Sequence, residues 1–213
     1  MATYNLEEQE KIDGMKSWWE SHGTSVIVIV SVVIASYAGT QGWQYYQQQQ
    51  RTQSADLYVL LQQVQQSEDA VKINDAAHLL LEGYPSSGYA PRAAMIAARA
   101  NVDAGDIKTA KGNLRWVLDN AKEEELKDLV RLRLAGLLLD EEKYNEALKL
   151  LDTRHGEAFA GLYADLKGDI NVAAGRNAEA QLAYQTAINM LGTNNNYYNM
   201  VQMKLDALGE VNE

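Results

Sequence analysis

The longest apolar stretch of the chain lies near its amino terminus, where residues 24–43 contain no charged side chain. Its centre, residues 26–35, is almost wholly aliphatic. About 20 residues at about 1.5 Å each match the roughly 30 Å hydrocarbon core of a bilayer. An isolated strand would leave its backbone groups unpaired in lipid, so the pattern predicts a transmembrane helix. A buried strand of a soluble protein is one alternative. A cleaved signal peptide is the other, disfavoured by the acidic leading segment.

Aromatic residues flank this segment on both sides. Trp18 and Trp19 precede it, and Trp43, Tyr45 and Tyr46 follow it. Such rings prefer the headgroup zone of a membrane, so their placement agrees with a span whose ends lie at two interfaces.

The distribution of positive charge predicts the orientation of the span. Lys11 and Lys16 precede it, whereas only Arg51 follows it before Lys72. The positive-inside rule then places the amino terminus in the cytoplasm. We expect a single-pass inner-membrane protein, with a cytoplasmic tail at 1–23, a transmembrane helix at 24–43 in contact with membrane lipid, and a periplasmic domain at 44–213.

The tail admits two interpretations. Leu6, Ile12, Met15 and Trp19 fall near one face of a helix, which would suit a docking helix for a cytosolic partner. The apolar stripe is narrow and the segment is acidic, which favours a solvent-exposed segment that only precedes the transmembrane helix.

Beyond the span, apolar residues recur at helical spacing. Residues 44–67 form a Gln-rich stalk. We expect helix pairs at about 53–84, 90–119, 126–154 and 158–191, followed by a single capping helix at about 197–208.

Internal similarity defines the architecture. The hexamers 105–110, 142–147 and 175–180 each end in Ala. The spacings are 147 − 110 = 37 and 180 − 147 = 33 residues, which bracket the 34-residue tetratricopeptide repeat. Each hexamer is preceded by a small residue on one helix and followed by a large residue on the next. The small residues are Ala98, Ala135 and Gly168, and the large residues are Leu114, Leu151 and Tyr184. Small residues packed against large ones are what interlocked helix pairs require. The predicted fold class is all-α, a single transmembrane helix followed by a tetratricopeptide-repeat-like stack of antiparallel helix pairs.

The amino-acid composition excludes some kinds of site and partner. The sequence has no Cys, which excludes disulfides and thiolate sites, and its formal net charge is −10. Residues 51–213 carry 17 Lys plus Arg and 24 Asp plus Glu, a net of 17 − 24 = −7. Their positive residues are scattered among acids, which argues against nucleic acid as a partner.

Catalytic and cofactor motifs are not found in the sequence. His22, His78 and His155 are the only imidazoles, and no two have metal-ligand spacing. No nucleophile elbow, phosphate loop or dinucleotide fingerprint occurs. We therefore expect neither an enzyme nor a cofactor or metal site.

The first helix of each pair lines the concave surface of such a stack, and its outward residues are candidates for binding other proteins. They mix apolar groups with both charges. The candidate groove residues are Arg92, Met95, Arg99, Val102, Leu132, Arg133, Leu139, Asp165, Asp169 and Val172. Leu132, Leu139 and also Leu162 fit equally a role in packing between units.

The combination of an acidic tail with Trp18-Trp19, one uncharged span, a Gln-rich stalk and a short repeat domain closing with Tyr197 resembles the YfgM family, an ancillary subunit of the bacterial SecYEG translocon. Gly83-Tyr84-Pro85, Gly105-Asp106 and residues 166–170 carry the resemblance. It implies a role beside the secretion channel. There a periplasmic domain would pass exported polypeptides towards periplasmic chaperones of the membrane-anchored PpiD type, and the tail would affect a stress-response regulator.

Two other functions remain open. One is an envelope scaffold or assembly factor unrelated to secretion. The other is a cytoplasmic regulator with the opposite orientation, in which the repeat domain would be shielded from protease added outside spheroplasts.

Overall fold

The computed structural model describes residues 6–192 and 196–209, and within these ranges every regular element is helical. The chain divides into two compact units, Met1–Thr52 and Gln53–Glu213. The predicted all-α architecture is confirmed, with the first nine stalk residues, 44–52, belonging to the amino-terminal unit.

Helix α1 (Leu6–Gln65) contains the uncharged segment. Its most apolar 18-residue window has a mean hydropathy of 1.8, and only 6% of that window is buried. The aliphatic side chains from Ile27 to Ile34 are exposed along the helix. By length and composition α1 is a candidate membrane span, the one such helix found in the described part of the chain.

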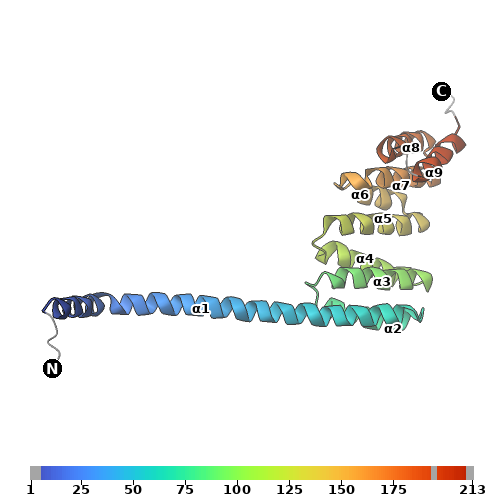
Figure 1. Ribbon diagram of the computed structural model, residues 1–213. Helices are drawn as coiled ribbons and strands as arrows, with labels where there is room; N and C mark the ends of the chain where they lie inside the picture. Colours follow the sequence, from blue (N-terminus) through green and yellow to red (C-terminus); the bar gives the residue numbers. More distant parts are fainter. Residues whose placement is uncertain (1–5, 193–195, 210–213) are drawn as a thin grey trace. The chain divides into compact units, whose positions relative to one another are not determined.

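The second unit is a series of antiparallel helices that follow one another in chain order (Figure 1). The end of α1 packs on α2 (Ala70–Gly83) and on α3 (Tyr89–Asp103) through Leu61, Leu80 and Ala93. The remaining helices are α4 (Ile107–Asn120), α5 (Glu124–Asp140), α6 (Tyr144–Leu151), the short 3₁₀ helix η1 (Glu157–Phe159), α7 (Ala160–Ala173), α8 (Asn177–Leu191) and α9 (Asn196–Ala207). The expected pairs and the capping helix are confirmed.

The three hexamers identified in the sequence form one kind of turn. Gly105, Glu142 and Gly175 each adopt positive φ, at 79°, 59° and 72°. The next amide in each turn donates to a carbonyl five residues earlier at 2.8 Å: Asp106 to Asn101, Lys143 to Leu138 and Arg176 to Asn171. This pattern closes a helix with a residue in the left-handed region, so three helix pairs are joined by equivalent C-caps.

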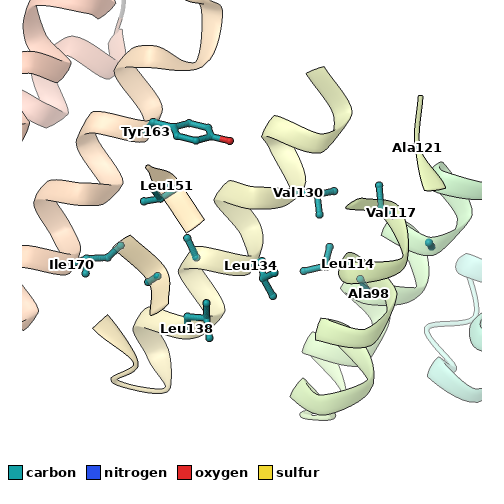
Figure 2. Packing of buried hydrophobic residues seen from close by; sticks show 13 residues of the cluster. Ala98, Leu114, Val117, Ala121, Val130, Leu134, Leu138, Leu151, Tyr163 and Ile170 are labelled. Carbon is teal, nitrogen blue, oxygen red and sulfur yellow. The ribbon is translucent and has the colours of Figure 1, made fainter. Parts of the chain in front are cut away.

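A continuous apolar core runs through the middle of the stack. Figure 2 shows Leu114 and Val117 of α4 facing Val130 and Leu134 of α5, with Leu151 on the far side of α5. Two further clusters bury the end of α1 with α2 and α3, and α7 with α8 and α9. Helices α3 and α7 also contribute residues to the central core. Each pair therefore shares its core with its neighbours, as stacked repeats require.

The interlocking of small and large residues is closest in the last pair. A Cβ atom at Gly168 would lie 2.3 Å from Cε1 of the Tyr184 ring. No side chain larger than glycine fits there without displacing the ring, which confirms the small-against-large reading for α7 and α8.

Candidate protein-binding surface

The candidate groove residues lie on the first helix of each pair, α3, α5 and α7, as the sequence predicts. Met95, Leu132 and Leu139 are half-buried and pack against the central core. Leu162 and Val102 are also half-buried. Arg99, Arg133 and Val172 are exposed. Arg92 is exposed as well, so the structure separates four exposed positions from the remaining, half-buried or buried ones.

Two of the arginines are engaged within the domain. The Arg92 guanidinium donates to the Glu123 carboxylate at 2.9 Å, which connects α3 to the residue that precedes α5. Arg99 pairs with Asp103 one turn along α3 at 2.8 Å, and this charge pair raises the pKa of Arg99. Both pairs are solvent-exposed and contribute little to stability, so they leave these side chains available to a partner.

Asp165 and Asp169 do not face an open groove. Lys204 of α9 donates to Oδ1 of Asp165 at 2.9 Å and to Oδ2 of Asp169 at 2.8 Å. Tyr197 donates to Asp165 at 2.5 Å, and Tyr184 of α8 donates to Asp169 at 2.7 Å. Asp165 is only 2% exposed. The expectation that this carboxylate is surface-exposed is wrong, because α9 covers it.

We call these five residues, Asp165, Asp169, Tyr184, Tyr197 and Lys204, the α9 clasp. Burial, together with hydrogen bonds to the aspartates, raises the pKa of Tyr184 and of Tyr197. Burial alone would lower the pKa of Lys204, but the hydrogen bonds and charges of Asp169 and Asp165 outweigh it, so this pKa is raised. The raised pKa values keep Lys204 charged and both phenols protonated at neutral pH, beside the side chains of Asp165 and Asp169.

Sequence reasoning did not find the clasp as a unit. Its members are separated by up to 204 − 165 = 39 residues, and no period links α9 to α7. The available signal was Asp165 itself, a charge at a position where the neighbouring residues of α7 are buried. A buried charge requires a paired group, which could have been sought among the basic residues of the capping helix.

The histidines and acids do not assemble into a metal centre in the described residues. His155 packs its ring on Tyr163, with centroids 4.3 Å apart, and His78 pairs with Glu82 at 2.9 Å. Each therefore has a local structural partner.

The fold and surface define a class of protein, a tetratricopeptide-like repeat domain attached to a long apolar helix. A tetratricopeptide repeat-like domain family matches residues 16–210. The ancillary SecYEG translocon subunit of Neisseria gonorrhoeae is 31% identical over 205 residues, which cover 96% of this chain and 98% of the relative. Those of Haemophilus influenzae (30% identity, 86% of this chain and 90% of the relative) and Escherichia coli (26%, 85% and 87%) are also similar. The chain belongs to the family of ancillary SecYEG translocon subunits.

Proposed function

We propose that α1 crosses the inner membrane once, with the tail in the cytoplasm and the repeat domain in the periplasm. The support is the uncharged segment at 24–43, its aromatic flanks, and the excess of Lys before it. An exposed aliphatic surface on one helix is unfavourable in water and favourable in lipid, so it supports membrane insertion without regard to orientation.

On this topology, the repeat domain is a non-catalytic module that binds other proteins beside the Sec translocon. It would help to pass exported polypeptides to periplasmic chaperones of the PpiD type. The observation that carries this proposal is the similarity to ancillary translocon subunits across 98% of the relative's length, spanning both the apolar helix and the repeats. The anchor would hold the repeats beside the channel exit, where emerging chains are unfolded and expose apolar segments.

The exposed groove positions supply the first contacts to test. Arg99, Arg133 and Val172 combine positive charge with an apolar group on the first helices of three successive pairs. Such a mixed surface suits extended or partly folded polypeptides better than one rigid partner. Asp165 and Asp169 are set aside as contacts, because their substitution would release α9.

The test is site-specific photocrosslinking of the full chain in native membranes. A photoreactive residue at Arg99, Arg133 or Val172 is expected to capture channel subunits, a translocating polypeptide or a periplasmic chaperone. The matched control is a photoreactive residue at Glu82, an exposed position on α2. Recovery of neither channel subunits nor a chaperone from any position would contradict the proposal and favour an envelope scaffold unrelated to secretion.

A further inference from the structure

One helix of the stack is about half the length of its counterparts. Helix α6 has 8 residues, whereas α4 and α8, which occupy the same place in their pairs, have 14 and 15. At about 1.5 Å per residue, six missing residues shorten α6 by about 9 Å. The side of α7 that a full-length α6 would cover is therefore left open.

The early end of α6 is fixed by specific contacts. The amide of Gly156 donates to Oδ2 of Asp128 at 2.9 Å, and Asp128 on α5 is itself buried. The Tyr163 hydroxyl donates to the Asp128 carbonyl at 3.1 Å, while the His155 ring lies against Tyr163. These bonds direct residues 152–156 towards α5 and away from the path of a continued helix.

The internal repeat indicates what would normally fill this space. Ala110 and Leu114 of α4 correspond to Ala147 and Leu151 of α6 at a spacing of 37, and all four are buried. Further along α4, Val117 is buried and Ala121 follows in the core cluster. Their counterparts are Arg154 and Ala158, both exposed. Val117 of α4 and Ala121, the residue that follows α4, thus cover α5 with an apolar pair at i and i+4, and α6 has no equivalent.

The result is a notch between α7 and α8 with a volume of about 490 Å³, lined by apolar residues together with His155, Lys167, Asn171 and Glu179. Its α8 wall is a helical stripe of Leu182, Ala183, Thr186 and Met190, and its α7 wall includes Ala160 and Ala164. Leu182 is 71% exposed and Met190 61% exposed. Large apolar groups at this exposure, at i and i+8 along one helix face, leave apolar area to bury against a partner.

We propose that this notch binds an amphipathic helix of a partner protein. The helix takes the place of the missing half of α6 with about two turns. Its contact face would follow the pattern of α4, a Val-sized residue and a small residue four positions later. Glu179 of α8 and Lys167 of α7 both line the notch, so polar residues on the flanks of the helix can pair with a charge of either sign. This inference rests on the proposed function, because it names the place on the repeat domain where a partner protein binds.

The test uses a peptide that carries this pattern, residues 107–121 of the chain, with Arg115→Lys joined to Asp119 by a lactam. Both positions are exposed on α4, so the bridge stabilises the helix without touching its contact face. The fluorescent peptide is titrated with the full-length chain in lipid nanodiscs, with empty nanodiscs as a blank, and its anisotropy is measured. We expect saturable binding, which a Val117→Asp substitution in the peptide abolishes.

Two variants of the chain locate the site. Leu182→Asp places a charge in the notch and is expected to weaken peptide binding at least about tenfold, since an apolar anchor is lost. Leu79→Asp introduces the same change at an exposed leucine of α2 and is expected to leave binding unchanged. Both leucines are exposed, so neither substitution removes a core contact.

Three outcomes overturn the inference. The first is a lack of saturable binding, and the second is an equal response of the Leu182 and Leu79 variants. The third is self-association of the chain in sedimentation velocity that Leu182→Asp alone abolishes, which would make a second copy the occupant. If the peptide fails to bind while crosslinks to the channel persist, this site is wrong and the proposed function stands. Loss of the crosslinks in the unsubstituted chain contradicts the proposed function itself.

Discussion

The backbone of Gly168 lies against the ring of Tyr184, whose hydroxyl donates to Asp169 one residue after that glycine. Two contacts with α7 therefore hold the ring: the backbone of Gly168 packs against its face, and Asp169 accepts the hydrogen bond from its hydroxyl. These contacts set the distance between α7 and α8 and fix one donor of the α9 clasp.

Substitution of this glycine tests the close approach. Gly168→Ala is expected to lower the free energy of unfolding by about 2–3 kcal/mol, because the added methyl group overlaps a ring that cannot move freely. Gly136→Ala is the matched control, since nothing lies within 4 Å of a Cβ there. It should stabilise helix α5 by about 0.5–1 kcal/mol. Urea unfolding followed by circular dichroism measures both, and an equal effect of the two would contradict the packing described.

The turn at Glu142 offers a stabilising change. Glu142 has φ of 59°, at the position that glycine occupies in the two equivalent turns. Glu142→Gly is expected to raise the free energy of unfolding by about 1 kcal/mol, because the left-handed conformation costs an ordinary residue about that amount. Gly105→Ala should have the opposite sign at similar size. A destabilised Glu142→Gly variant in the same urea measurement would show that the side chain, not the backbone, dominates at this turn.

The clasp should depend on its single cation. Lys204→Met leaves two carboxylates near each other, of which Asp165 is almost fully buried, and is expected to cost about 3 kcal/mol. Hydrogen exchange should become faster throughout α9. Lys72→Met removes the Lys from an exposed pair with Asp69 and is expected to cost less than about 1 kcal/mol. Unchanged exchange in α9 of the Lys204 variant would mean that the apolar contacts alone hold the helix.

The free energy of unfolding should decrease at alkaline pH because of buried tyrosines and Lys204. Burial, together with the nearby Asp128 charge, raises the pKa of Tyr163 to about 12, and the pKa values of Tyr184, Tyr197 and Lys204 are also raised. A pKa that is higher in the folded state than in the unfolded state gives stability that is complete below the unfolded value. It is lost as pH rises through the folded value. Stability should therefore be independent of these groups up to about pH 10 and fall above it.

Tyrosinate absorbance checks the alkaline prediction. Tyr163, Tyr184 and Tyr197 should ionise at higher pH in the folded chain than in denaturant, and helix content should fall as they do. In denaturant all tyrosines should ionise together near their ordinary pKa of about 10. A native titration curve that overlays the denatured one would contradict the raised pKa values.

The sequence predicted the elements that depend on local pattern. Helical periodicity located the helix pairs, and the hexamers located three turns that share one hydrogen-bond geometry. The pairing of Gly168 with Tyr184 was also readable, because a small and a large residue recur at fixed distances from each turn. These features are local, and each repeat supports the others.

Features that depend on a single pair of helices were not predicted. The clasp joins α9 to α7 through Lys204 and Asp165, which no repeat relates, so Asp165 was expected on the surface. The pair predicted at 126–154 ends at Leu151, within the expected margin, but the repeat gave no reason for α6 to be shorter than α4, since Ala147 and Leu151 fit the repeat. After Leu151, a long-range hydrogen bond from the Gly156 amide to the Asp128 carboxylate holds the chain against α5.

The central claim is that the repeats lie on the periplasmic side of a membrane crossed by residues 24–43. The chain has no Cys, so single cysteines introduced at exposed positions report on their compartment without background. Intact cells are treated with a membrane-impermeant maleimide that passes the outer membrane. Asn145→Cys should be labelled at once, and Glu10→Cys only after the inner membrane is disrupted. Labelling of Glu10→Cys with protection of Asn145→Cys would contradict the account.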